Sequence, residues 1–432
     1  MLRKIFALAT LLSWGANCEQ VMSTKLKISS AATKNEFTLV RVEIEPEYVN
    51  YLSDALTFNA SFRLKWDGVN KYLNSKTTNV STYDDISRPK IVNNIGSAEL
   101  RNLYIDYTMD DLTLRLGKQQ IVWGQLDGYK LMDQVNPQSY EQFILEDFND
   151  SRIGLWSLKA DYIINSGLLE FVVTPDDTVS YLSSNDEQFV FTASRFRANI
   201  DPFKDKVVKA VQNKQQGLLS NESYAVRYSE YFDFWDYSLA VIHGVDHQPV
   251  FELSTTPIGN VLSRTYKQRT LFAASMSSTI GDTVVRSEVG YYPNRSFNER
   301  QGTLLPTIVE KDQATIAVAI DLSLPASTLL SIQLIYDQVF SADQNLTRPE
   351  NDTVLTVTTK KKIWDEQGEL DFRLYAANGI FKDFLIRAKM KYYFEDDTEL
   401  VLGADVFSGE PSGIYGQFEQ NDRVFVSLLR YF

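Results

Sequence analysis

The chain has 432 residues, a formal net charge of −13 and a mean hydropathy of −0.23. Its length fits either about two or three soluble domains or one large barrel. No apolar run reaches the roughly 18 residues that a membrane-spanning helix requires, although strands that are only half apolar can still span a membrane as a barrel. The acidic balance disfavours nucleic-acid binding, which needs basic surface.

The first residues predict a secretory signal. Arg3 and Lys4 precede an apolar stretch from Ile5 to Trp14, and small residues before Glu19 offer a cleavage site after Cys18. A buried N-terminal helix and a lipidated Cys18 are the alternatives. Because Cys18 is the only cysteine, cleavage after it would leave a mature chain without disulfides.

Alternation with a period of two residues follows the signal. Between Leu56 and Trp66 every even position is apolar and every odd position is polar, so a strand would place the two sets on opposite faces. The same alternation recurs in hairpins through to the C-terminus. It predicts an all-β fold, a transmembrane up-and-down antiparallel barrel of about 16 strands (14–18) beginning near Leu56.

The domain boundaries follow from this pattern. Residues 1–18 are expected to form the signal peptide, residues 19–55 a periplasmic segment or an extra strand, and residues 56–432 the barrel. Phe37 to Ile44 already looks like a strand. Residues 171–220 and 354–362 are ambiguous, and within the first of these Asp201 to Ser220 is interpreted as a short amphipathic helix.

Two features favour a barrel over a soluble β-sandwich, which also alternates. The chain ends on Phe432, with apolar residues at Val424, Val426 and Leu428, a pattern that resembles the C-terminal signal of outer-membrane barrels. Arg430 departs from it. In addition, short turns alternate with long polar loops, as periplasmic turns and outer loops do. The long ones are residues 67–97, 245–267, 294–311, 341–352 and 408–420.

The segment from Gly117 to Trp156 is too polar to face lipid and too apolar to be a free loop. One interpretation folds it into the lumen, where its charges would line a constriction; the other packs it on the outer rim. Together with polar wall positions on later strands, it supplies the candidate pore-lining residues. They are Arg115, Lys118, Gln119, Asp127, Lys130, Asp133, Asp150, Arg152, Arg286, Glu288, Arg387 and Lys389.

The same segment carries a family resemblance. The stretches WGQLDGYKLMDQVNP and FILEDFNDSRIGLW look like a block in a poorly characterised family of large proteobacterial outer-membrane β-barrel proteins, which are porin-like. Residues 241–251 and 281–293 are similar to further parts of that family. The resemblance implies a barrel in the outer membrane, sometimes linked to export or uptake of hydrophobic compounds. It supplies no catalytic residues.

Basic residues are frequent on the polar faces of the strands. They outnumber mid-strand acidic residues and would favour anions in a narrow pore. A wall of paired charges without selectivity is the alternative. The residues are Arg63, Lys65, Arg115, Arg227, Arg286, Arg373, Arg387, Lys389 and Lys391.

Enzyme chemistry has little support in the sequence. His243 and His247 are the only histidines, and their spacing would suit a metal only on a helix, whereas residues 242–244 look like a strand end. No serine or aspartate stands out as a nucleophile beside either histidine. We therefore expect no enzyme, no metal and no cofactor.

The leading hypothesis is an outer-membrane channel or transporter for small or hydrophobic solutes in a Gram-negative bacterium. The alternative is a plugged structural or interaction barrel that assists an envelope export system. Expected partners are outer-membrane lipid and lipopolysaccharide, and the barrel-assembly machinery through the strand that ends at Phe432. A homo-oligomer is a further option, and no nucleic acid is expected.

Overall fold

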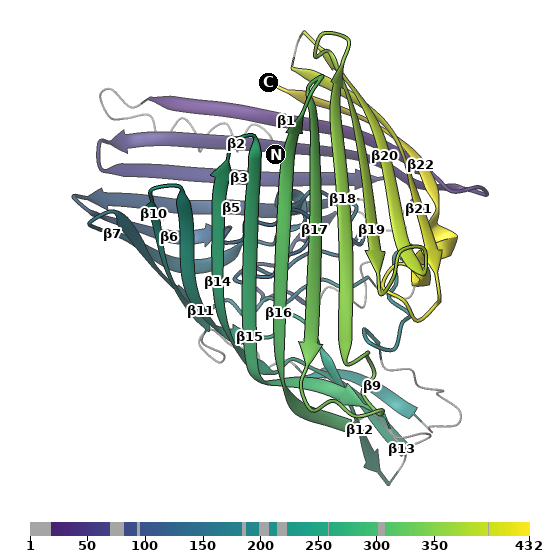
Figure 1. The fold of residues 1–432 in the computed structure, drawn as a ribbon. Helices are drawn as coiled ribbons and strands as arrows, with labels where there is room; N and C mark the ends of the chain where they lie inside the picture. The colour runs from purple at the N-terminus through teal and green to yellow at the C-terminus, as the bar shows by residue number, and fades with distance from the viewer. Residues whose placement is uncertain are drawn as a thin grey trace.

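A computed structural model describes residues 19–69, 82–92, 96–183, 187–197, 207–213, 223–257, 259–300, 307–395 and 397–432 (Figure 1). The expected signal peptide, residues 1–18, lies outside the described residues. No helix in these ranges is long and apolar enough to cross a membrane.

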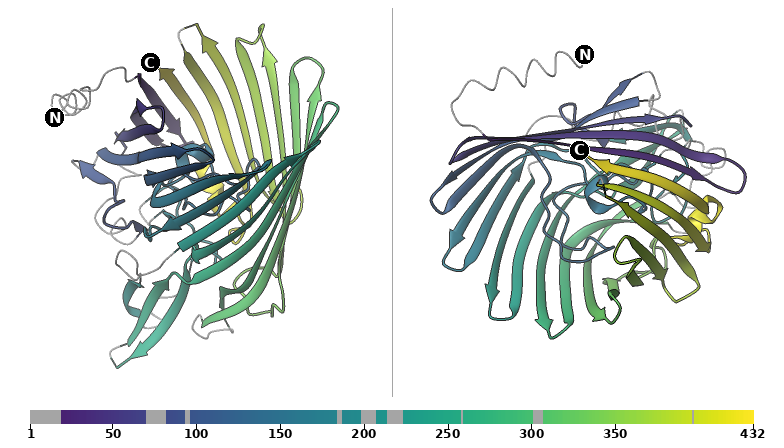
Figure 2. Two further views of the ribbon diagram at one scale, coloured as in Figure 1. Left: turned by 90° about the vertical axis from the view of Figure 1, so that its left-hand side faces the viewer. Right: turned by 90° about the horizontal axis from the view of Figure 1, so that it is seen from above.

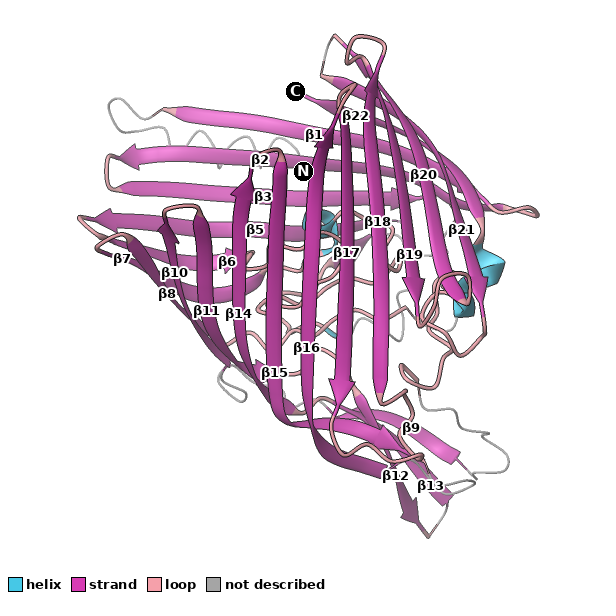
Figure 3. Cartoon of the chain, in the orientation of Figure 1, coloured by secondary structure: helices cyan, strands magenta, loops and turns pink. Residues whose placement is uncertain are grey.

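Eighteen strands form a closed antiparallel barrel in which each strand pairs with its neighbours in chain order (Figures 1 and 3). They are β1 (Gln20–Ala32), β2 (Phe37–Ser53), β3 (Leu56–Asp67), β5 (Gly96–Met109), β6 (Leu112–Gln119), β7 (Leu155–Ile164), β8 (Gly167–Thr174), β10 (Ser223–Phe232), β11 (Trp235–Val245), β14 (Gln268–Ile280), β15 (Thr283–Glu299), β16 (Thr307–Leu324), β17 (Thr328–Val339), β18 (Asn351–Ile363), β19 (Gly368–Ala377), β20 (Asp383–Phe394), β21 (Thr398–Gly409) and β22 (Arg423–Tyr431). A short strand, β4 (Lys90–Val92), adds to the end of β5.

The barrel closes between its first and last strands. β1 pairs with β22 from Lys25 opposite Tyr431 to Ala32 opposite Val424. At the same seam the backbone N–H of Thr24 donates to the carbonyl of Phe432, and the N–H of Phe432 donates back. Both ends of the described chain therefore lie at one end of the barrel, and the pairing of β1 with β22 closes the barrel wall.

The strand number corrects the expected sixteen, because the barrel begins at Gln20 and not near Leu56. The additional strands β1 and β2 come from the segment assigned to a periplasmic lead-in or one extra strand. β2 is hydrogen-bonded on both sides, to β1 and to β3. Its inward face carries the acidic row Glu43, Glu45 and Glu47, and the strand expected at Phe37 to Ile44 is the first part of it.

The outward faces of the strands form the apolar belt that the alternation predicted. In β3, Phe62 and Trp66 are exposed on the outside, while Arg63 and Lys65 are buried inside. Exposed aromatic residues gather toward both ends of the strands, as in interfacial girdles. Arg430 points outward, as Val424, Val426 and Leu428 do, and its guanidinium lies 4.9 Å from the centre of the Phe432 ring.

Short turns lie at the end of the barrel that holds both termini. They span two to four residues between paired strands, as at Asp54-Ala55, Asp110-Asp111 and residues 364–367. The longer connections lie at the opposite end, as expected for outer loops. Two expectations about these connections are wrong. The first is the long loop expected at residues 294–311, because most of these residues belong to β15 and β16, which extend beyond the barrel wall.

The second error concerns the expected helix at residues 201–220. Its described part, β9 (Val207–Asn213), is a strand and pairs in parallel with β13 (Gly259–Thr265), which also pairs with β12 (Val250–Thr256). The Val-rich sequence suits a strand because β-branched side chains pack well on a sheet. This small sheet projects from the long-loop end in Figure 1.

Gly117 lies in β6 with a backbone conformation that favours glycine. Its φ is +138°, and an added Cβ would lie 2.1 Å from the carbonyl oxygen of Leu103. We expect Gly117→Ala to lower the free energy of unfolding by about 2–4 kcal/mol, because both strain and overlap are introduced. Gly281→Ala is the control: Gly281 also has a positive φ but no atom within 4 Å of the added Cβ, so about 1 kcal/mol is expected. Urea unfolding in lipid vesicles would show the difference, and equal losses would contradict this explanation.

Candidate functional site

The segment between β6 and β7 lies inside the barrel (Figure 2, right; Figure 3). Gln119 at the end of β6 pairs with Leu155 at the start of β7, so the two strands need only a short turn. Instead residues 120–154 intervene, and they include the short helix α3 (Phe148–Ser151). We call residues 120–154 the lumen segment.

One side of the lumen segment is bound to β1, β2 and β3 by ion pairs. Asp150 lies 2.8 Å from Lys25, 3.5 Å from Lys27 and 3.2 Å from Arg63. Burial alone would raise the pKa of the Asp150 carboxyl, but these three cations hold it well below its usual range. Glu141 binds both Arg41 and Lys65. The carboxylates of the segment therefore neutralise the basic side of the wall.

The opposite side of the segment is bound to β20 and β22 through Asp405. This fully buried carboxylate lies between Arg387 and Arg423, its cross-strand neighbours, at 2.9 and 2.8 Å. Arg387 also donates to the carbonyls of Ile144 and Leu145, at 3.3 and 2.8 Å. Arg423 donates to the side chain of Gln142 at 3.1 Å. One acidic side chain thus orients two arginines toward the segment.

A third anchor lies on β15. Glu288 is 1% exposed, and its carboxylate accepts the backbone N–H groups of Gln125 at 2.6 Å and Met132 at 3.0 Å. Arg286, two residues away, binds Asp127 at 3.0 Å and Asp321 at 2.7 Å. Anchors on strands around the whole barrel therefore hold the segment across the lumen.

The other candidate pore residues differ in their surroundings. Lys118, Gln119, Asp133 and Arg152 are buried, and Arg152 pairs with Asp133. Lys130 and Asp127 are at least partly open to the lumen. Arg115 is separate from the segment, because its guanidinium binds Asp106 on β5 and lies 4.0 Å from the Tyr104 ring. Lys389, on β20, has no carboxylate within 4.0 Å among the described residues.

The expected basic wall is neutralised by pairing. Eight of its nine cations have a carboxylate partner, from the lumen segment or from the strands themselves; Lys389 is the exception. Examples are Arg227 with Glu170, Arg373 with Asp371, and Lys391 with Glu369 at 3.3 Å. The alternative of a paired wall is therefore the better description, and a strong anion preference does not follow from the wall.

A second segment inside the barrel was not anticipated. Residues 175–183 and 187–197 follow β8, and Tyr181 exchanges backbone hydrogen bonds with Gln138 and Tyr140 of the lumen segment. Phe189 and Phe191 pack with Phe143 and Phe418 in an aromatic cluster. The aromatic residues at 189, 191 and 196 were the available signal, but the three positions together fit neither one strand period nor one helix period.

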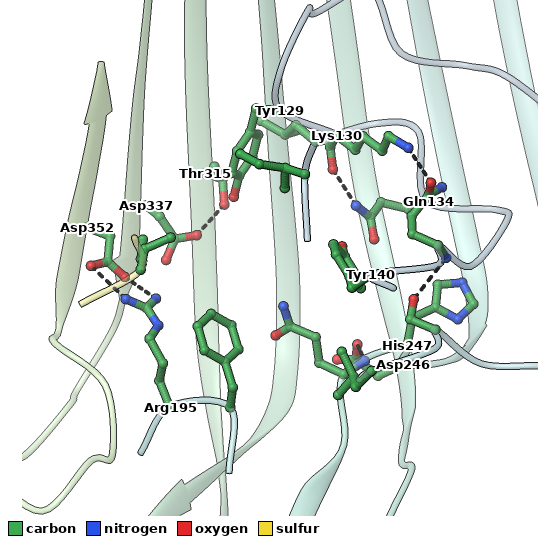
Figure 4. Close-up of a pocket in the computed structure, with 18 of the residues that line it drawn as sticks. Tyr129, Lys130, Gln134, Tyr140, Arg195, Asp246, His247, Thr315, Asp337 and Asp352 are labelled. Carbon is green, nitrogen blue, oxygen red and sulfur yellow. Dashed lines mark hydrogen bonds and ion pairs between the residues drawn. The ribbon is translucent and has the colours of Figure 1, made fainter. Parts of the chain in front are cut away.

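A cavity of about 330 Å³ remains between the lumen segment and the wall formed by β14 to β18 (Figure 4). Arg295 binds Asp246 at 2.7 Å on one side, and on the other Asp352 binds both Arg195 and Arg348. Aromatic side chains fill the surfaces between these pairs. They are Tyr129, Tyr140, Phe143, Phe148, Phe191, Phe196, Tyr292, Phe297 and Tyr415.

The two histidines do not form a common site. His243 stacks on Tyr224, with ring centres 4.9 Å apart, and its Nδ1 lies 2.8 Å from the hydroxyl of Thr270. His247 lines the cavity, and burial lowers its pKa to about 3. Among the described residues, the group with metal-ligand spacing is Asp84, Asp176 and Asp177. In that group Asp176 already accepts hydrogen bonds from Ser87, Thr178 and the backbone of Trp156.

Comparison of the sequence with known families matches residues 58–367 to "Protein of unknown function (DUF1302)". The chain belongs to the DUF1302 family. The expected resemblance to a porin-like outer-membrane family is thereby confirmed. The DUF1302 match begins within β3 and ends in the turn before β19, so it includes the whole lumen segment. No curated protein matches the sequence.

Solved structures similar to this DUF1302 barrel include outer-membrane porins. OccAB1 of Acinetobacter baumannii has a TM-score of 0.53 at 9% identity, over 96% of this chain and 97% of that one. OccK8 (OprE) of Pseudomonas aeruginosa has 0.53 at 10%, over 96% and 98%. OccD3 (OpdP) of the same species has 0.50 at 10%, over 96% and 90%. At these identities the likeness establishes a porin-like outer-membrane fold.

Proposed function

We propose that this protein is an outer-membrane channel that passes small or hydrophobic solutes through a lumen narrowed by residues 120–154. The observation that carries the proposal is the placement of the lumen segment. It crosses a barrel of 18 strands, a size that otherwise leaves an aqueous lumen, and it leaves a cavity beside it. The candidate pore residues on this segment, from Asp127 to Arg152, would then set size and charge at the constriction.

Liposome swelling tests the proposal. Pure refolded protein should make vesicles permeable to a pentose but much less permeable to a disaccharide, because the lumen segment leaves only a narrow path. Vesicles without protein and vesicles with heat-unfolded protein are the controls. A folded barrel that admits no solute of either size would contradict the channel.

The second candidate is a barrel plugged by its own loops that assists an export system. The anchors on Asp150, Glu141 and Glu288 favour it, because they hold the lumen segment from several sides. Swelling separates the two candidates, since a plugged barrel stays closed to solutes of both sizes. In either case we propose outer-membrane lipid and lipopolysaccharide as neighbours of the apolar belt. The barrel-assembly machinery is the proposed partner of the strand ending at Phe432.

A further inference from the structure

Lys130 differs from the other cations that line the cavity. Arg195, Arg348 and Arg295 each bind an aspartate, and Arg269 lies 3.7 Å from Asp246. Lys130 has no carboxylate within 4.0 Å among the described residues. Its ammonium bonds to the side-chain carbonyl of Gln138 and lies 4.2 Å from the centre of the Phe148 ring.

Five cations and five carboxylates line the cavity, but Lys130 takes no part in the ion pairs among them. Asp246, Asp337 and Asp352 bind the lining arginines, and Asp133 is bound by Arg152 from outside the lining. Lys130 is therefore the lining cation without a carboxylate of its own among the described residues. His247 is uncharged at neutral pH. The cavity therefore suits a ligand with negative charge.

The aromatic lining adds a second requirement. Nine aromatic side chains surround the cavity, and such surfaces favour ligands with an apolar or aromatic body. The volume of about 330 Å³ is near the lower end of small-ligand pockets. A small ligand with one apolar body and one anionic group would satisfy both parts of the lining.

We infer that the cavity binds an amphipathic monocarboxylate, with the carboxylate on Lys130 and the apolar body against the aromatic side chains. The inference rests on the proposed function, because it names the solute class that the channel would hold on its way through. In the free protein, Gln138 and Phe148 take the place of the ligand beside the ammonium. A carboxylate would be the stronger acceptor, since charge-assisted hydrogen bonds exceed neutral ones.

Binding should depend on pH through Lys130. Burial is the main reason that the pKa of this lysine is lowered to about 7; Asp133 opposes the shift and Arg152 adds to it. A bound carboxylate favours the charged lysine, so affinity should be greatest below pH 7 and fall as the pH rises above it. The arginines that line the cavity stay protonated from pH 6 to 8.5, and Asp246 and Asp352 have pKa values below their usual ranges.

Equilibrium dialysis of the full chain in lipid nanodiscs tests the inference, with empty discs correcting for partition into lipid. The probes are 4-phenylbutyrate, 4-phenylbutanol and 4-phenylbutylamine, which share one apolar body. At pH 6.5 we expect the carboxylate to bind about tenfold or more tightly than the alcohol, and the amine more weakly still. Equal binding of the carboxylate and the alcohol would overturn the inference.

Two variants connect the binding to Lys130. Lys130→Gln should weaken 4-phenylbutyrate binding about tenfold and leave the alcohol unchanged. Lys130→Arg should bind 4-phenylbutyrate as tightly as the wild type, but its affinity should not fall between pH 6 and 8.5. If Lys130→Gln does not fold, Lys130→Arg still tests the assignment. Lys159→Gln is the matched control, because Lys159 lies on the wall outside the cavity and its partner Glu170 keeps Arg227. A Lys130→Arg variant that retains the pH dependence would contradict the assignment.

The inference and the proposed function fail separately. Carboxylate binding in a barrel that passes no solute would overturn the channel alone. Solute passage without carboxylate selectivity would overturn the binding site alone.

Discussion

Replacing residues 120–154 with four glycine and serine residues should raise the unitary conductance of the barrel at least about threefold. The barrel should tolerate this change, because Gln119 and Leu155 are already paired and a short turn can join them. The rise is expected because the lumen segment crosses the pore and is bound on several sides. Planar-bilayer recording of the pure refolded protein measures it.

A matched deletion controls for the loss of loop mass. Phe251 pairs with Arg264 in the hairpin of β12 and β13, which projects from the barrel (Figure 1). Replacing residues 252–263 with the same linker should leave the unitary conductance near that of the wild type. A folded 120–154 replacement with unchanged conductance would show that the segment does not obstruct the pore.

The same replacement should also change ion selectivity. Asp150, Glu141 and Glu146 leave with the segment, so the cations of β1 to β3 lose these partners. Those cations are Lys25, Lys27, Arg41, Arg63 and Lys65. The reversal potential in a salt gradient should therefore shift toward anions, an effect that high ionic strength weakens. A shift toward cations would contradict the pairing described here.

Asp405→Ala should lower the free energy of unfolding by about 3–5 kcal/mol, because it leaves two buried guanidinium groups without their shared carboxylate. Arg387 and Arg423 are 3% and 7% exposed, and Asp405 is fully buried. Asp405→Asn should lower the free energy of unfolding by less, because the asparagine side chain has the same shape and keeps one acceptor oxygen. Urea unfolding in lipid vesicles, followed by tryptophan fluorescence, measures both.

A surface ion pair supplies the control for Asp405. Asp85 lies 2.7 Å from Arg88, but its side chain is 85% exposed. Asp85→Ala should change the free energy of unfolding by less than about 1 kcal/mol. Similar losses for Asp405→Ala and Asp85→Ala would mean that the buried group around Asp405 does not stabilise the barrel.

The strands could be predicted from the sequence where a local alternation of apolar and polar residues marks them. In β3 the alternation of Phe62, Arg63, Leu64, Lys65 and Trp66 identifies a strand with one face in lipid. β1 was missed, and β2 was expected only over Phe37 to Ile44; Pro46 follows directly, and proline is uncommon inside sheets. The helix expected at residues 201–220 failed for another reason. The partner of β9 lies in β13, about fifty residues away, and local periodicity carries no information about it.

The candidate site was predictable in location but not in detail. The mixed polar and apolar character of residues 117–156 pointed to the lumen, and the structure places residues 120–154 there, with the flanking residues in β6 and β7 (Figure 2). The charge balance could not be predicted, because Asp150 is 125 residues from Lys25 and nothing local couples them. For the same reason the sequence left open whether the basic wall residues are free or paired. The cavity also depends on Arg195 and His247, which come from connections with no strand pattern.

The most direct test of the channel is planar-bilayer recording of the wild-type protein, refolded from pure chain and compared with the 120–154 replacement. The channel hypothesis predicts discrete current steps from the wild type, and larger steps from the replacement. An absence of steps from both folded proteins would contradict it.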